Sequence, residues 1–319
     1  MKKPAFAVLL AGLVGGGCVL AQNEPGWQTA ASGIPHANRP INIGGKAVFT
    51  PMVFGARGDG VADDTSAVQQ AIDHAAYSTL YLGRHRYCVN ALSISTPVRI
   101  LGGVQSAQSG SAEPAFVACS ANRNLITIRK TASGTVLKEF AILMGQNGIV
   151  NTRGAAVVDR APLTRVAGVL IDRPCIGIDE EGNSNTYTVR INNVQGGACV
   201  GIRLGNGMTD DGSIDARIIN STIVGEYPPV SGSIGMEFLA AGGTYLANND
   251  ILYTQTGTAI VPGAGQSGHW LSFANTVLGD STLGDALRID TRAVSAVIGG
   301  LKFAGTWTGS AGRNQHTGT

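Results

Sequence analysis

The residues best suited to chemistry in this chain are carboxylates in Gly- and Asn-rich stretches. Asp210, Asp211 and Asp215 lie close together, and residues 179–181 are three consecutive acids. Hard oxygen ligands of this kind suit calcium. The alternative is structural, because solvated acids are ordinary in loops. The first cluster is the candidate metal site, since it can lie in an insertion between repeats.

His269 and Trp270 form a second candidate pair. A histidine can transfer protons near neutral pH, and an indole ring can stack on the apolar face of a sugar. We therefore take His269 as a candidate catalytic residue and Trp270 as a candidate substrate-binding residue. The structural alternative is that Trp270 only begins an apolar strand over residues 270–273.

The elements that would position these residues follow an internal repeat. Segments that begin at Cys175, Cys199 and Ser233 share a pattern in which Gly stands between two apolar residues, and looser copies follow. The third residues of these segments are spaced 24, 34, 24 and 27 residues apart. Short strands recurring at such a period predict stacked coils, in which each coil completes the core of its neighbours. The sequence therefore predicts a β-solenoid, with an insertion near residues 209–215 or 227–232.

A second, polar series interleaves with this repeat. Asn192, Asn220, Asn248 and Asn275 are spaced 28, 28 and 27 residues apart, each between β-branched or apolar residues. Asparagine tolerates left-handed turns, and stacked copies can hydrogen-bond between coils. We therefore expect these residues to be structural.

Four cysteines follow the first 21 residues: Cys88, Cys119, Cys175 and Cys199. None has the close spacing of a zinc site. Cys175 and Cys199 share one repeat position in successive coils, so they can form a disulfide or remain two small buried thiols. We expect buried thiols there, and the sequence leaves the state of the other two open.

The N-terminus has the pattern of a signal peptide. Lys2 and Lys3 precede an apolar run that is too short to span a bilayer, and Val19-Leu20-Ala21 offers a cleavage site. We expect residues 1–21 to be removed and the protein to be secreted or periplasmic, with lipid anchoring at Cys18 as an alternative.

The charge balance excludes some partners. Cleavage of the signal peptide would lower the formal net charge from +2 to zero, because it removes two lysines and no acids. A neutral chain offers no broad electrostatic surface for nucleic acid. No later apolar stretch is long enough for a transmembrane segment.

The clearest local signal lies at residues 53–65, where a strand leads into a Gly-rich turn. Asp63 or Asp64 can cap a following helix, which is expected over about residues 64–76. The apolar side chains of this helix recur at helical spacing and form one stripe, made of Val68, Ala71, Ile72 and Ala75. We expect this helix to cover one end of the core.

The stretch Phe54-Gly55-Ala56-Arg57-Gly58-Asp59-Gly60, followed by Asp63-Asp64-Thr65, resembles the opening of the pectate-lyase-like superfamily. That grouping includes polygalacturonases, rhamnogalacturonases, related lyases and phage tailspikes. The resemblance implies an all-β chain folded as a single-stranded right-handed parallel β-helix with a short N-terminal capping helix. The motif indicates the fold and not a catalytic activity, so Asp59, Asp63 and Asp64 are expected to form turns and helix caps.

The expected domain order follows from this resemblance. An extended lead-in at residues 22–45 would precede the β-helix domain at residues 46–319. No cap is evident at the C-terminal end, although terminal repeats normally carry one. Residues 304–319 would cover that end, a homo-oligomer would cover it, or the chain is truncated there.

The resemblance also bears on catalysis. Polygalacturonase-like members carry acids just before a strand of this type, but Gly197 and Ala198 occupy those positions here. Polygalacturonase chemistry is therefore not expected. Pectate lyases use an arginine or lysine base and calcium, and their Arg-x-Pro-x-x-Arg pattern fits Arg160, Pro162 and Arg165. We take both arginines as candidate catalytic residues, with a solvated turn as the structural alternative.

These observations leave three hypotheses of function. The first is an exported carbohydrate-active protein, a polysaccharide lyase or glycoside hydrolase acting on an acidic polysaccharide, which rests on fold analogy. The second is a non-catalytic glycan-binding or surface structural protein, favoured by the missing acidic pair. A tailspike-like protein is third, because the signal peptide disfavours it. Polysaccharide is the expected partner, and calcium is the one cofactor that the acids suggest.

Overall fold

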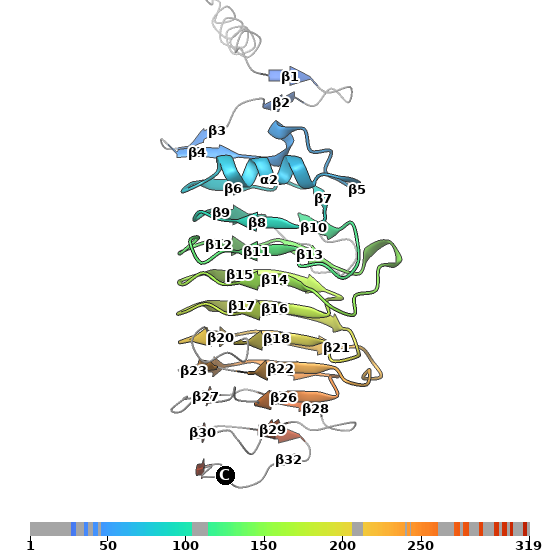
Figure 1. Cartoon of the computed structure of the whole chain (residues 1–319), viewed down its shortest axis with the longest axis vertical. Helices are drawn as coiled ribbons and strands as arrows, with labels where there is room; N and C mark the ends of the chain where they lie inside the picture. The colour runs from blue at the N-terminus through green and yellow to red at the C-terminus, as the bar shows by residue number, and fades with distance from the viewer. Residues whose placement is uncertain are drawn as a thin grey trace, which may run out of the picture.

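The computed structural model describes residues 46–103, 114–205, 213–239, 241–242 and 244–260, together with the backbone of short strands nearer the two ends. Within these residues the chain winds into stacked coils, each built of up to three short strands (Figure 1). Each strand pairs in parallel with its equivalent in the coils on either side. Three columns of strands result, which we call ladders A, B and C in the order in which each coil visits them.

The ladders differ in where they begin and how they join. Ladders A and B merge in β15 and β17, because both strands run through the bend between them. Ladder A contains β4 (Lys46–Phe49), β6 (Thr79–Tyr81), β9 (Arg99–Leu101), β12 (Val136–Lys138), the first parts of β15 (Arg165–Asp172) and β17 (Thr186–Val194), β20 (Arg217–Ile219), β24 (Thr244–Ala247), β27 (Leu271–Ala274), β30 (Val297–Gly299) and β33 (Gln315–Thr317). Ladder B contains β5 (Asp59–Asp63), β7 (Arg86–Val89), β10 (Ala115–Ala118), β13 (Ala141–Leu143), the later parts of β15 and β17, β21 (Thr222–Gly225), β25 (Asp250–Leu252), β28 (Val277–Asp280) and β31 (Lys302–Ala304). Ladder C contains β8 (Leu92–Ile94), β11 (Ile126–Ile128), β14 (Ala155–Asp159), β16 (Ile176–Glu180), β18 (Val200–Leu204), β22 (Ile234–Phe238), β26 (Thr256–Ile260), β29 (Leu287–Ile289) and β32 (Trp307–Thr308).

The remaining elements lie outside the ladders or begin them. The two antiparallel pairs are β1 (Trp27–Thr29) with β2 (Pro35–Ala37), and β3 (Ile41–Ile43) with β4. A further parallel pair joins β19 (Ser213–Ile214) to β23 (Ala241–Gly242). The helical elements are η1 (Pro51–Phe54), α2 (Thr65–His74) and η2 (Gln146–Gly148). The expectation of an all-β parallel β-helix with one short helix near its N-terminus is therefore confirmed.

The repeat in the sequence corresponds to ladder C. The side chains of Ile178, Ile202 and Met236 are fully buried in the core. A Cβ atom on Gly177, Gly201 or Gly235 would lie only 2.4 to 2.6 Å from a carbonyl oxygen of the next coil. The glycine at the third position of the repeat is therefore required by close stacking of the coils.

The bends between ladders use left-handed residues, as the asparagine series predicts. Asn220 and Asn248 have φ values of 50° and 53° and stand one above the other between ladders A and B, where the Asn248 amide donates to the Asn220 carbonyl oxygen at 3.2 Å. Asn192 is an exception, because the left-handed residue in that strand is Asn193. Asn275 lies outside the described residues.

The capping helix α2 is confirmed, although it is shorter than expected at both ends. Its buried side chains Val68, Ala71 and Ile72 pack on the first coils, and it lies across the N-terminal end of the stack (Figure 1). The Asp63 carboxylate accepts from the Thr65 backbone N–H at 2.9 Å and thus pairs one of the free N–H groups at the start of the helix. The Asp64 carboxylate instead accepts from the N–H groups of Arg57 and Gly58, at 2.7 and 3.0 Å. These aspartates are structural, as expected.

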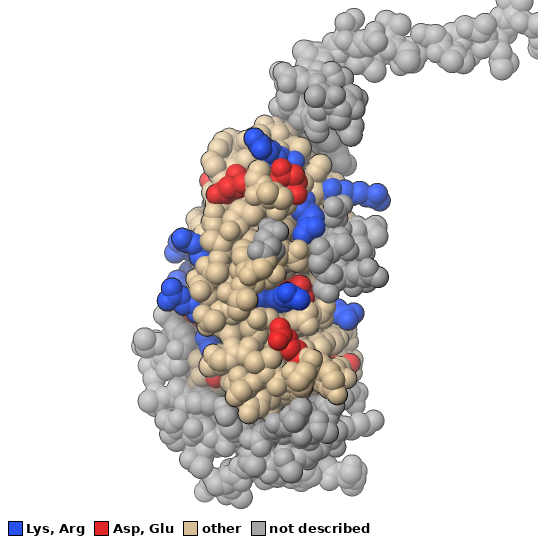
Figure 2. All heavy atoms as spheres, turned by 90° about the vertical axis from the view of Figure 1, so that its right-hand side faces the viewer, with Lys and Arg blue, Asp and Glu red and all other residues tan. Residues whose placement is uncertain are grey.

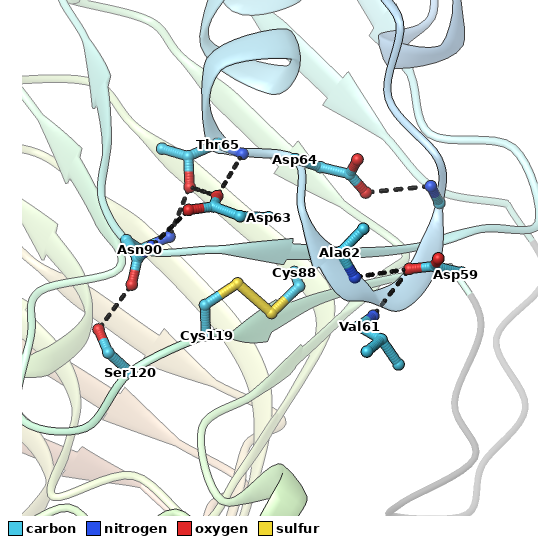
Figure 3. Close-up of a disulfide and its surroundings, with 11 residues drawn as sticks. Asp59, Val61, Ala62, Asp63, Asp64, Thr65, Cys88, Asn90, Cys119 and Ser120 are labelled. Atoms are coloured by element: carbon cyan, nitrogen blue, oxygen red, sulfur yellow. Dashed lines mark hydrogen bonds between the residues drawn. A yellow bond between two sulfur atoms is a disulfide. The ribbon is translucent and has the colours of Figure 1, made fainter.

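Two disulfides join successive coils. Cys88 pairs with Cys119 beside the polar contacts that link Asp63 to Asn90 and Asn90 to Ser120 (Figure 3). Cys175 pairs with Cys199, so the expectation of two buried thiols is wrong. Stacking of equivalent residues brings the last two Cα atoms to 4.5 Å, within the range that a disulfide bridges.

Replacing Cys175 and Cys199 together by serine should lower the free energy of unfolding by about 3 kcal/mol, because the crosslink that constrains the unfolded chain is lost. Urea denaturation of the mature protein measures this change. As a control, the mature protein unfolded without reductant should expose no reactive thiol. Four free thiols in that control would contradict both disulfides.

Candidate functional site

A row of charged side chains crosses the outer face of ladder C. Asp179, Arg203 and Glu237 occupy the same position in β16, β18 and β22, so they are direct neighbours in register. Each is two residues beyond the repeat glycine of its strand. Alternation of side chains along a strand places them outside the core, whereas Ile178, Ile202 and Met236 point into it. We call Asp179, Arg203 and Glu237 the charged row.

Ion pairs hold the charged row and its surroundings. The Arg203 Nε donates to Glu237 Oε2 at 2.8 Å, and the two side chains are only 25% and 14% exposed. Beside them, the Arg160 Nε donates to Glu181 Oε2 at 2.9 Å. Partly buried pairs of this kind resist screening by salt better than exposed pairs do. The four side chains are therefore fixed in position next to Asp179.

Asp179 is the member of the charged row with a perturbed acidity. Burial raises the pKa of Asp179 to about 6, and the nearby Arg203 opposes this rise. The charge of Glu181 raises the pKa of Asp179 further, and the charge of Arg160 lowers it. A carboxyl group of this kind carries a proton at mildly acidic pH and can act there as a general acid.

A second set of acids lies inside the coils, behind the end of ladder C. Asp159 and Glu180 are neighbours in register, and both side chains are fully buried. The Tyr187 hydroxyl donates to Asp159 Oδ2 at 2.8 Å, and the Asn185 amide donates to Glu180 Oε1 at 2.9 Å. Burial raises the pKa of Asp159 to about 7, and the hydrogen bond from Tyr187 opposes this rise. The buried acids therefore brace the turn from ladder C to ladder A.

Comparison with known proteins identifies the family. Residues 52–283 match the family described as "Rhamnogalacturonase A/epimerase, pectate lyase-like". The chain belongs to this family. The resemblance seen in the opening motif is thus confirmed for most of the β-helix. No curated protein matches the chain in sequence.

Several solved structures are similar to this pectate lyase-like chain. The "Agl-KA catalytic domain" has a TM-score of 0.55 and 17% identity, covering 83% of this chain and 49% of that one. A GH87 α-1,3-glucanase catalytic unit from Streptomyces thermodiastaticus strain HF3-3 has a TM-score of 0.48 and 16% identity, covering 85% of this chain and 54% of that one. Tailspike protein 2 of an Escherichia coli O157:H7 bacteriophage has a TM-score of 0.44 and 15% identity, covering 86% of this chain and 44% of that one. This chain therefore spans about half the length of these structures, and at this identity the likeness shows the fold alone.

The structure separates the two arginines of the lyase-like pattern. Arg160 follows β14 on ladder C and joins the ion pairs around the charged row. Arg165 begins β15 on ladder A, beyond the intervening turn, and is exposed. The two guanidinium groups therefore belong to different faces of this pectate lyase-like β-helix, and only Arg160 adjoins the charged row.

The expected metal site is described only in part. Asp215 is exposed at the turn into ladder A, in a left-handed conformation, while Asp210 and Asp211 lie outside the described residues. The three acids at residues 179–181 do not converge, because Glu180 points into the core and Asp179 points out. Within the described part of the chain no three His, Cys, Asp or Glu side chains are grouped as metal ligands.

His269 and Trp270 also lie outside the described residues, so their roles stay predictions. The described aromatic side chain with the greatest exposure near ladder C is Tyr227, at 79%. Its ring stands edge-on to that of Tyr253, with centroids 5.2 Å apart. Both tyrosines lie in turns that lead from ladder B into ladder C. They form an aromatic surface of the kind that stacks on sugars.

The charged row was not predicted from the sequence, although the repeat contains a pattern that indicates it. The repeat alignment marks Gly177, Gly201 and Gly235, and the residue two positions beyond each is charged. Three charged residues at one outward repeat position indicate a row on the surface. Figure 2 shows the side of the molecule turned to the right of Figure 1, where the described charged residues are scattered and of both signs.

Among the described residues no helix is long and apolar enough to cross a bilayer.

Asp159→Asn should make stability less dependent on pH. The folded-state pKa of about 7 exceeds the ordinary value of 3.8, so this group stabilises the fold fully below pH 4, and that contribution is lost as the pH rises to 7. Between pH 4 and pH 7, the free energy of unfolding of the variant should therefore fall less steeply than that of the wild type, by up to about 1.4 kcal/mol per pH unit. Urea denaturation between pH 4 and 8 measures it. Asp250→Asn, at an exposed acid of β25, should leave the decline unchanged, and an equal effect of both variants would contradict the assignment.

Proposed function

We propose that this chain is an exported carbohydrate-active enzyme that hydrolyses a polysaccharide on the outer face of ladder C. The observation that carries the proposal is the charged row, in which a carboxyl group with a raised pKa and an ion-paired carboxylate flank one arginine. Glycoside hydrolysis needs two carboxyl groups, one that donates a proton and one that activates water or attacks the sugar. Asp179 and Glu237 supply this pair.

The roles follow from the two environments. Asp179 keeps its proton to higher pH than an ordinary aspartate, because it is partly buried, so it is the general acid that protonates the leaving oxygen. The Glu237 carboxylate is held in place by its ion pair with the Arg203 guanidinium, so it is the base that activates water. Arg203 in turn orients the Glu237 carboxylate through this ion pair.

The spacing of the two acids favours inversion of configuration. They are two strands apart in register, which places their backbones about 9–10 Å apart. Inverting enzymes hold their carboxyl groups roughly 6.5–9.5 Å apart to leave room for water. A covalent glycosyl intermediate would need a shorter separation.

Lyase chemistry has less support. Its candidate base, Arg160, is ion-paired with Glu181, and an arginine side chain stays protonated in proteins. Arg165 is on another face of the β-helix. The calcium ligands that lyase chemistry would use, Asp210, Asp211 and Asp215, remain a proposal, as do the roles of His269 and Trp270.

The second candidate function is glycan binding without cleavage. It is favoured by the exposed Tyr227 and its half-buried neighbour Tyr253, and by the turn before β18, where Gly197 and Ala198 stand in place of acids. Export is supported by the signal-peptide pattern at residues 1–21 and by two disulfides, which form and persist in oxidising compartments.

Asp179→Asn and Glu237→Gln should each lower kcat by roughly 10²–10⁴-fold, because each removes one proton-transfer group. The assay follows new reducing ends on a panel of neutral and acidic polysaccharides, with calcium and with chelator. The wild-type rate should fall as the pH rises through about 6. Asp250→Asn, an exposed acid on ladder B, serves as the matched control and should retain full activity.

Two outcomes would overturn the proposal. Unsaturated uronic products that disappear with chelator would establish a lyase. Binding to a polysaccharide without any product across the panel would establish the non-catalytic function.

A further inference from the structure

A column of arginines runs along the outer face of ladder A, away from the charged row. Arg99, Arg165 and Arg217 occupy one register position in β9, β15 and β20. Val136 separates the first two, and Thr186 separates the last two. An arginine therefore recurs at every second strand, with a repeat of about 9–10 Å along the axis.

These arginines differ from those near ladder C. All three side chains are exposed, and none makes a hydrogen bond or ion pair with another described residue. Arg160 and Arg203, in contrast, each donate to a glutamate within 3 Å. Within the described part of the chain, the column thus presents three positive charges in a line without an ion-paired acid, although the whole chain is almost neutral.

A groove adjoins the last arginine of the column. Its volume is about 820 Å³. Tyr245, which follows Arg217 in register on the next strand, is 41% exposed and lies along the groove. The rest of the lining consists of apolar, hydroxyl and carboxylate side chains, which belong to Leu163, Ile219, Ser184, Thr186 and Asp215.

We propose that this face of ladder A binds an acidic polysaccharide that runs along the axis of the β-helix. Arginine matches a carboxylate with two parallel hydrogen bonds, and the repeat of the column matches a chain that carries regularly spaced acidic groups. Tyr245 stacks on a sugar ring, while Ser184, Thr186 and Asp215 bond to its hydroxyl groups. This surface is separate from the charged row, and the proposal does not depend on hydrolysis there.

The chemistry of the groove favours a saccharide over nucleic acid. Nucleic-acid sites rely on a broad basic surface to neutralise many phosphates, and Asp215 places a carboxylate in this groove. A mixture of one aromatic ring, hydroxyl groups and one acid suits the alternating apolar and hydroxyl surfaces of a sugar. The arginines then select those sugars that carry a negative charge.

The test compares two pairs of substitutions of equal charge in the full mature protein. Arg165→Gln with Arg217→Gln should weaken binding of polygalacturonate at least about tenfold. Arg123→Gln with Arg153→Gln, two exposed arginines in turns at the other edge of the coils, should change it less than about twofold. Calorimetric titration at low and high salt measures both, and binding should weaken with salt. Tyr245→Ala should weaken binding independently of salt.

Three outcomes would overturn the proposal. Equal losses in the two pairs would show a nonspecific effect of net charge. Equal binding of uncharged dextran would remove the role of the arginines, and equal binding of double-stranded DNA would remove the preference for a saccharide. Dextran sulfate distinguishes a general anionic glycan from a uronic acid, and weaker binding of dextran sulfate supports carboxylate recognition.

The test separates this proposal from the proposed function. A protein that binds polygalacturonate through ladder A but cleaves nothing would refute the hydrolase and leave this site in place. A protein that cleaves but binds equally well without these arginines would refute this site alone.

Discussion

Parallel stacking of one coil on the next is the constraint on which the rest of this molecule depends. A coil cannot bury its own inward side chains, so its neighbours must complete the core. Register then forces equivalent residues into columns about 4.8 Å apart. The glycines at 177, 201 and 235 exist because the carbonyl oxygen of the next coil leaves no room for a Cβ atom. Cys175 meets Cys199 for the same reason.

The same constraint explains how one short segment supplies two chemically different sites. Successive residues of a strand point to opposite sides, so Asp179 joins the outer charged row while Glu180 faces the interior. Inside, Glu180 stacks on Asp159, and hydrogen bonds from Asn185 and Tyr187 compensate for burial of the acids. Outside, Asp179 has Arg203 as its neighbour. Acidic residues that are consecutive in sequence are therefore not one site in a β-helix.

The sequence was sufficient for the architecture because the repeat and the opening motif are local signals. The strand and turn periods, the helix near residues 65–74 and the structural role of Asp63 and Asp64 could all be predicted from residue types. The disulfides could not, since a choice between a bridge and two thiols depends on a Cα separation that only the stacked coils define. The candidate functional site was harder to predict than the disulfides. Arg160 was identified by a motif, but its neighbours Arg203 and Glu237 are distant in sequence and meet only through register.

The outer faces of ladders C and A differ in whether their charges are paired, and this difference favours different functions for them. On ladder C, Arg203 stands between Asp179 and Glu237, so each charge has an opposite charge beside it and can tolerate partial burial. On ladder A, positions 136 and 186 lie directly beside the arginines and could have held acids, yet they are valine and threonine. Exposed arginines need no partner for stability, so their repetition is not explained by packing. A column of like charges at one register position is costly to the fold only through self-repulsion, and an acidic chain lying along it would remove that cost.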